Sequence, residues 1–179
     1  MRVIAGEFRS RVLKSLPGLD VRPTPDKMRE ALFSILAMRI EGAVFADIYA
    51  GTGAVGIEAL SRGAKRAIFV EQSKAAVDIV RANLKSLGIE DRARIWHGRA
   101  ASVIFKMEPV DIAFLDPPYP QEQEYERALI ALGDEPPRLA IAQHASRFEL
   151  KESYGVLKRG RVVKHGDNSL SFYAVGSAP

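Results

Sequence analysis

Residues 43–64 read AVFADIYAGTGAVGIEALSRGA. The first eight are almost all apolar, which is typical of a β-strand buried on both faces of a sheet. They pass into the glycine-rich turn GTGAVG and then into a helix that we expect to end at Gly63. Because a strand, a glycine turn and a helix in this order open a βαβ unit, this stretch predicts an α/β fold with a parallel sheet.

The same alternation continues toward the C-terminus. We expect a helix that begins at the N-cap Ser73 and stops at Gly88, and a second helix over 125–132. After residue 150 the pattern predicts strands and no helix, with a closing antiparallel pair at 156–166 and 169–175. The remaining strands are expected at 67–70, 93–97, 111–115 and 139–144. Helices are therefore expected on both faces of a mostly parallel sheet.

Two elements are predicted before this unit. The segment VIAGEFRSRVLKSL, residues 3–16, has two β-prone runs around a polar centre and predicts a small hairpin. In the next segment Thr24 is a suitable N-cap for a helix with Pro25 in its first turn. Met28, Leu32 and Leu36 recur at helical spacing and are expected in the core.

The composition indicates an ordinary globular chain. With 179 residues, 47% apolar and 27% charged, we expect one domain over 1–179, with a hairpin over 1–20 and a catalytic body over 21–179. The absence of cysteine excludes disulfides and thiolate metal sites, and three scattered histidines do not suggest a metal centre. No segment resembles a signal peptide or a membrane span, so a cytoplasmic location is expected.

The net charge of +4 is unevenly distributed. Residues 1–30 carry seven basic and four acidic side chains, and residues 147–168 carry six and three, so each segment is +3. The rest of the chain is therefore about −2. Basic ends around a near-neutral body suggest a polyanionic partner such as nucleic acid, although solvated surface cations would give the same count.

The glycine turn indicates a nucleoside-containing cofactor. Gly51, Gly53 and Gly56 form G-x-G-x-x-G between a strand and a helix, and Glu71 follows at the end of the next strand, where a carboxylate can accept from ribose hydroxyls. Asp47 adds a second carboxylate inside the first strand. That position favours the cationic S-adenosylmethionine over a dinucleotide, while a buried Asp that caps the loop amides is the alternative.

The tetrapeptide Asp116-Pro117-Pro118-Tyr119 follows the expected strand 111–115 and should face the same crevice. Its two prolines make a rigid turn whose carbonyls are available as acceptors. Asp116 and the Pro117 carbonyl could accept the two N–H groups of an exocyclic base amine, and Tyr119 could stack on that base. This arrangement predicts methyl transfer to a base amine, with a purely structural Pro-Pro turn as the alternative.

These motifs resemble class I S-adenosylmethionine-dependent methyltransferases. More narrowly, RVIAGEFRSRVL (residues 2–13) and RPTPDKMREALFSIL (residues 22–36) resemble the RsmD-type 16S ribosomal RNA guanine-N2 methyltransferases. The resemblance implies a Rossmann-like sheet of seven strands with an N-terminal hairpin. It also implies that S-adenosylmethionine is the cofactor and that the 2-amino group of a guanine in small-subunit rRNA is the target.

The resemblance also implies roles for individual residues. The target amine would meet Asp116, Pro117, Pro118 and Tyr119. The cofactor would be bound by Asp47, Ala50, Gly51, Thr52, Gly53, Gly56, Glu71, Gln72, Arg99 and Ala100. RNA would be contacted by Arg9, Arg11, Arg22, Thr24, Lys27 and Arg29. Arg99 departs from the family pattern, because it cannot accept a hydrogen bond from the adenine amino group, which leaves backbone groups near Ala100 for that role.

Three alternatives stay open from the sequence. A DNA adenine or cytosine amino-methyltransferase would share the DPPY motif, but it usually needs a recognition region for which 179 residues leave little room. An NAD-dependent oxidoreductase gives no role to DPPY. A non-catalytic RNA-binding module would not need Glu71 or the glycine turn.

Overall fold

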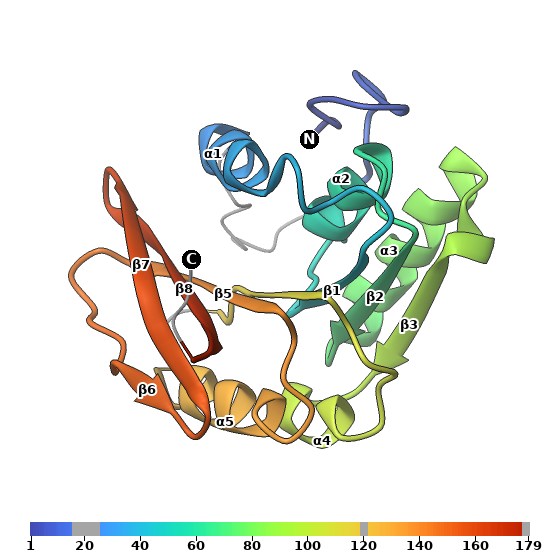
Figure 1. Cartoon of the computed structure of the whole chain (residues 1–179). Coiled ribbons are helices and arrows are strands. Elements are labelled where there is room, and N and C mark those ends of the chain that lie inside the picture. The colour runs from blue at the N-terminus through green and yellow to red at the C-terminus, as the bar shows by residue number, and fades with distance from the viewer. Residues whose placement is uncertain (16–25, 119–121, 177–179) are drawn as a thin grey trace.

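The structure is a computed structural model, and it describes residues 1–15, 26–118 and 122–176. Its centre is a sheet with the strand order β3-β2-β1-β4-β5-β8-β7-β6 (Figure 1). The first five strands are parallel, and β8, β7 and β6 continue the sheet in antiparallel pairing. The strands are β1 (Val44–Ile48), β2 (Arg66–Glu71), β3 (Ala93–His97), β4 (Ile112–Leu115), β5 (Leu139–Ala145), β6 (Ser153–Tyr154), β7 (Leu157–His165) and β8 (Asn168–Val175).

The described sheet has one strand more than the seven that the resemblance implies. The additional strand is β6, only two residues long, at the edge beside β7. Tyr154 pairs with Leu157 across a tight turn in which Gly155 has a φ of 58°. Such a turn needs a positive φ, and glycine adopts it without steric cost. The parallel strands and the closing antiparallel pair agree with the prediction.

Helices cover the two faces of the sheet in separate groups (Figure 1). One hydrophobic core joins the sheet to α1 (Asp26–Leu36), α2 (Ala54–Ser61) and α3 (Lys74–Leu87). The other joins it to α4 (Ala100–Ile104) and α5 (Glu122–Leu132). A short 3-10 turn, Glu90–Arg92, precedes β3. The apolar stripe expected on α1 is confirmed, since Met28, Leu32 and Leu36 are at most 1% exposed.

The predicted ends of α3 are also confirmed. The Ser73 hydroxyl accepts a hydrogen bond from the Ala76 amide at the start of the helix, and Gly88 takes the left-handed conformation at its end, with a φ of 70°. These local signals act over a few residues, so they are readable from sequence.

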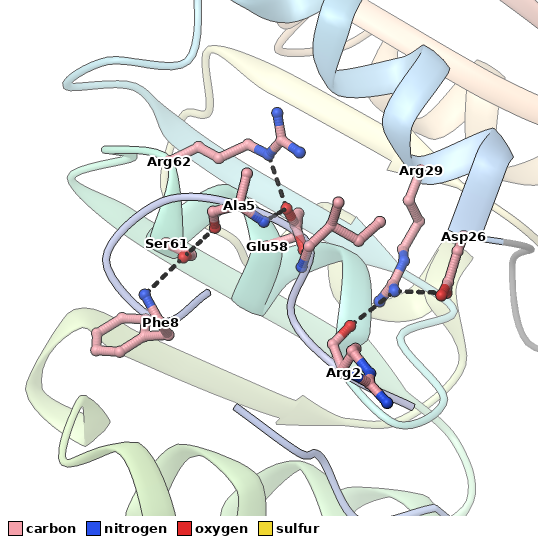
Figure 2. A network of polar contacts seen from close by, with 9 residues as sticks. Arg2, Ala5, Phe8, Asp26, Arg29, Glu58, Ser61 and Arg62 are labelled. Carbon is pink, nitrogen blue, oxygen red and sulfur yellow. Dashed lines mark hydrogen bonds and ion pairs between the residues drawn. The ribbon is translucent and has the colours of Figure 1, made fainter. Parts of the chain in front are cut away.

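The predicted N-terminal hairpin is present in the described residues 1–15, although its β-ladder is short. Arg2 and Val12 form an antiparallel bridge, flanked by hydrogen bonds from the Val3 amide to the Arg11 carbonyl at 3.0 Å and from the Leu13 amide to the Met1 carbonyl at 2.9 Å. The amides of Ile4 and Ala5 instead donate to the Glu58 carboxylate of α2, at 2.8 and 3.0 Å, and the Phe8 amide donates to the Ser61 hydroxyl (Figure 2). The hairpin therefore packs as an arm against α2, because the backbone donors near its turn that have no partner across the ladder find acceptors on that helix.

Gly6 is required where this arm touches α2. Its φ is 83°, and a Cβ there would lie 1.8 Å from the Ser61 carbonyl oxygen. Glu58 itself is completely buried, and the Arg62 Nε also donates to it at 2.7 Å. A buried carboxylate with three donors is well compensated, so it joins the arm firmly to the body.

Among the described residues, no helix is both long enough and apolar enough to cross a bilayer.

Candidate functional site

The polar residues singled out in the sequence gather at the carboxyl ends of the parallel strands. The strand order reverses between β1 and β4, and in such sheets the crevice at this switch point is the usual ligand site. Side chains alternate between the two faces along a strand. At four places in the sheet, an apolar residue that packs on the α1–α2–α3 face is followed two positions later by a polar residue. The pairs are Phe45 and Asp47, Phe69 and Glu71, Phe114 and Asp116, and Ile141 and Gln143.

Asp47 supports the glycine loop through a hydrogen bond to its backbone. Its side chain is 2% exposed, and its Oδ2 accepts a hydrogen bond from the Gly56 amide at 2.8 Å. Burial raises the pKa of Asp47 to about 8, and the nearby carboxylates of Asp116 and Glu71 act in the same direction, whereas the Gly56 amide opposes them. The capping role considered for Asp47 is therefore real, and a cationic ligand beside it would favour its ionised form.

The glycine loop makes a tight left-handed turn. Gly51 and Gly53 have φ values of 55° and 78°, and the Gly53 amide donates to the Ala50 carbonyl at 2.8 Å. A Cβ on Gly51 would meet no atom within 4 Å. The backbone of the loop thus borders open space, which a ligand could occupy. The Thr52 carbonyl faces the other way and accepts from the Asn83 amide group.

Glu71 holds the loop from the neighbouring strand. Its Oε2 accepts from the Gly51 amide at 2.9 Å, and its Oε1 accepts from the Ser73 amide at 2.8 Å. A carboxylate offers about four lone-pair sites, so two amides leave room for two further donors. The hydroxyls of a ribose are suitable donors for that position.

A small pocket opens beside Glu71. It is lined by Tyr49, Val70, Glu71, Gln72, Gly98 and Ala100. Arg99, expected among the cofactor-binding residues, is exposed and does not line it. Its contribution is through the backbone, since its carbonyl accepts from the Ser102 and Val103 amides at the start of α4.

Asp116 lies at the end of β4, next to β1. Its amide donates to the Ile48 carbonyl at 3.4 Å, and its Oδ2 accepts from the Gln143 Nε2 at 3.0 Å. Pro117 is buried and Pro118 is exposed. The carboxylate is therefore oriented by a side chain from β5 and anchored beside a rigid turn. Tyr119 lies outside the described residues.

Sequence reasoning missed two residues of this site. The sequence signal for Gln143 is its polarity, because it is a polar residue near the end of the otherwise apolar, buried strand LAIAQHA. Tyr49 lines the pocket and has a φ of 70°, which is rare for a non-glycine residue. Its hydroxyl donates to the Glu124 carboxylate of α5 at 3.1 Å. Burial and this carboxylate raise the pKa of Tyr49, so the phenol is a donor at neutral pH.

The residues predicted to bind RNA fall into three groups. Arg9, Arg11 and Lys27 are exposed, as expected. The prediction for Arg29 is wrong, because its side chain is completely buried. It donates to the Arg2 carbonyl at 2.9 Å and to Asp26 at 2.8 Å, and so joins α1 to the N-terminal arm (Figure 2). The other two, Arg22 and Thr24, lie outside the described residues.

Within the described ranges, no group of three or more histidine and acidic side chains is placed to hold a metal ion. His144, next to Gln143, is buried between the Ser171 hydroxyl and the Ala145 carbonyl. Burial lowers its pKa, which keeps it neutral.

The family model described as "Conserved hypothetical protein 95" matches residues 1–174. The chain belongs to this family. It is the RsmD family that the motifs of the N-terminal segments and of the glycine loop resemble. Two curated relatives and one solved structure show how far the similarity extends.

YlbH of Bacillus subtilis is 35% identical over 182 residues, which span 97% of this chain and 98% of YlbH. "Ribosomal RNA small subunit methyltransferase D" of Escherichia coli is 39% identical over 120 residues, spanning 66% of this chain and 60% of that protein. The solved structure of yhhF from Escherichia coli matches with a TM-score of 0.86 at 31% identity and covers 99% of both chains. The RsmD-type α/β architecture predicted from the sequence is confirmed by this agreement.

Proposed function

We propose that this RsmD-family chain is a cytoplasmic S-adenosylmethionine-dependent methyltransferase that modifies an exocyclic base amine of RNA. The target is the 2-amino group of a guanine in 16S rRNA. The observation that carries the proposal is the convergence of Asp116, at the end of β4, with Asp47 and Glu71 on one face at the switch point of the sheet. The Escherichia coli relative, named as a small-subunit rRNA methyltransferase, supports RNA as the substrate.

The residues at the glycine loop fit the cofactor. The open space at Gly51 is a cradle that any side chain would fill. Glu71 retains acceptor capacity for a ribose, and Gly98 and Ala100 offer a pocket wall without bulky side chains. When bound, S-adenosylmethionine supplies an electrophilic methyl group on a sulfonium.

The acidic character of the site suits that cation. Three carboxylates lie close enough together for Asp116 and Glu71 to raise the pKa of Asp47. A dinucleotide would bring two phosphates into this negative field and would be repelled. The cofactor loop therefore favours a cationic nucleoside over NAD, which weakens the oxidoreductase alternative.

Asp116 and the Pro117 carbonyl act on the nucleophile. An aryl amine has its nitrogen lone pair delocalised into the ring, and acceptors for its two N–H groups draw the nitrogen toward a tetrahedral, nucleophilic geometry. Asp116 is anchored for this role by the hydrogen bond from Gln143. In this scheme Tyr119 stacks on the base, and the exposed Arg9, Arg11 and Lys27 bind phosphates.

The decisive experiment supplies a tritiated methyl donor with unmodified 30S subunits, naked 16S rRNA and DNA in parallel. The labelled nucleoside is then identified after digestion. We expect N2-methylguanine in rRNA, whereas N6-methyladenine in DNA would support the DNA enzyme instead. Asp116→Ala should abolish transfer and keep cofactor binding, measured by equilibrium dialysis. Near wild-type turnover in this variant would contradict the assigned role.

A further inference from the structure

A buried side chain of α3 supports the glycine loop from outside the sequence motifs. Asn83 is completely buried near the end of that helix. Its Nδ2 donates a hydrogen bond to the Thr52 carbonyl at 3.0 Å, across 31 positions of the chain. Burial of an amide is favourable only when its polar atoms are paired, so the partners of Asn83 show which segments it joins.

The other partner of Asn83 is the end of the N-terminal arm. The Lys14 amide donates to Asn83 Oδ1 at 2.7 Å, and Asn83 Nδ2 donates to the Lys14 carbonyl at 3.1 Å. Pairing of both backbone groups of one residue is the pattern of an antiparallel ladder, and here a side-chain amide takes the place of the partner strand. The two hydrogens of Nδ2 are therefore divided between the arm and the glycine loop.

The hydrogen bond to the loop fixes the peptide group between Thr52 and Gly53. The carbonyl of that peptide accepts from Asn83, and its N–H donates to the Ala50 carbonyl at 2.8 Å. Gly51 and Gly53 both have a positive φ, and glycine also adopts negative φ values without steric cost. A loop with this freedom keeps one shape only when its peptide groups are held by their surroundings.

Helix α3 is a firm base for this contact. Val80 lies one turn before Asn83 and so on the same face of the helix. It is buried against the loop, since a Cβ on Gly53 would lie 3.2 Å from Val80 Cγ2. At the start of the helix the Ser73 amide donates to Glu71, the carboxylate that also accepts from the Gly51 amide. The helix therefore meets the loop through both apolar and polar contacts.

We propose that Asn83 is a positioning residue for the cofactor: it holds the Thr52–Gly53 peptide in the orientation that the cofactor needs, and Lys14 of the arm holds Asn83. This inference rests on the proposed function, because it takes S-adenosylmethionine as the ligand of the loop. A loop that already has its bound shape loses little entropy when the ligand arrives, so removal of Asn83 appears as weaker cofactor binding. The N-terminal arm thus supports the cofactor site in addition to carrying the cations proposed to contact RNA.

The test is Asn83→Leu, which keeps the approximate size of the side chain and removes its donors and acceptor. S-adenosylmethionine binding is measured by calorimetry without RNA, with the stoichiometry reporting the folded fraction. We expect affinity to fall by about threefold to tenfold, the net contribution of one hydrogen bond. In transfer assays this loss appears in KM for the cofactor and not in kcat, because saturating cofactor itself holds the loop. Asn83→Ala, which cannot overpack the site, serves if Asn83→Leu does not fold.

The chain offers a matched control in Ser61 of α2. Its side chain is also buried, and its hydroxyl donates to the Ala5 carbonyl at 2.6 Å and accepts from the Phe8 amide at 2.9 Å (Figure 2). These bonds hold the arm at its turn, whereas Asn83 holds it at Lys14 and reaches the loop. Ser61→Ala should therefore lower the free energy of unfolding and leave cofactor affinity within twofold of the wild type.

The outcomes separate this inference from the proposed function. Wild-type cofactor affinity in folded Asn83→Leu, or equal losses of affinity in Asn83→Leu and Ser61→Ala, would overturn the positioning role while binding by the wild type stands. A loss confined to kcat would contradict it as well. If the wild type itself does not bind S-adenosylmethionine, the proposed function fails first, and the inference fails with it.

Discussion

Replacing Gln143 by leucine separates positioning of Asp116 from the stability of the fold. The Gln143 side chain is 5% exposed, and its Nε2 donates to Asp116 Oδ2 at 3.0 Å. Its Oε1 is buried and has no hydrogen-bond partner among the described residues. Leucine has a similar size, removes the donor that orients the carboxylate and also removes the buried acceptor that lacks a partner.

The expected effect on catalysis follows from the loss of one hydrogen bond to a charged group, about 1.5 to 3 kcal/mol. If all of it appears in the transfer step, the rate falls by about 10-fold to 150-fold, since 1.36 kcal/mol corresponds to a factor of ten. Stability should change little or even rise, because a buried acceptor without a partner costs about 1 to 3 kcal/mol and is eliminated.

The assay is single-turnover methyl transfer to 16S rRNA at saturating cofactor and RNA, together with urea unfolding of the same preparation. His144→Leu is the matched control. His144 is the next buried polar residue on β5, and its side chain bonds to Ser171 and not to Asp116. We expect His144→Leu to lose stability but to retain its rate per folded molecule. A Gln143→Leu rate within threefold of the wild type would refute the positioning role.

Three further predictions concern the loop and the arm. The pKa of Asp47 in the folded protein, about 8, lies above its ordinary value, so the contribution of this residue to stability is present at low pH and is lost as pH rises toward 8. Between pH 5.5 and 8.5 the free energy of unfolding, measured in urea, should therefore fall less for Asp47→Asn than for the wild type. An equal fall in both proteins would contradict the raised pKa. Glu58→Gln should lower the free energy of unfolding by about 2 to 4 kcal/mol in the same assay, because an amide NH₂ would face a backbone donor of the N-terminal arm. A loss of stability below about 1 kcal/mol would argue against the role of Glu58 in holding the arm. Gly56→Ala places a Cβ 2.4 Å from Phe69 Cε1 and should cost about 1 to 3 kcal/mol by overpacking. Gly51→Ala has open space around its Cβ, but the φ of 55° at this position strains alanine and should cost about 1 to 2 kcal/mol of stability. Gly51→Ala should in addition weaken cofactor binding measured by calorimetry, and unchanged affinity would contradict the cradle.

Much of the fold could be predicted because its signals are local. The β1 run, the glycine turn, the Ser73 cap and the Gly88 stop each involve a few consecutive residues. The five-residue α4 and the two-residue β6 were not predicted, since elements this short show no periodicity.

The residues of the candidate site also fall into two groups, those that local sequence patterns reveal and those that only tertiary contacts bring together. Asp47 and Glu71 are recognisable because each lies at a characteristic spacing from Gly51. Gln143 is not, because its partner Asp116 is 27 residues away and only the pairing of β4 with β5 brings them together. Arg29 shows the opposite error, since a cation in a basic segment was expected at the surface and is buried instead.

The sequence by itself determined the α/β class, the cofactor loop and the rigid turn after β4, because these depend on residues adjacent in the chain. The tertiary structure decided which side chains face one another. It docked the predicted hairpin as an arm on α2, through bonds to Glu58 from residues more than fifty positions away. It also brought the closed end of the β7–β8 hairpin to the edge that holds Asp116. Contacts of this kind follow from strand order and helix packing, which no local pattern of residues encodes.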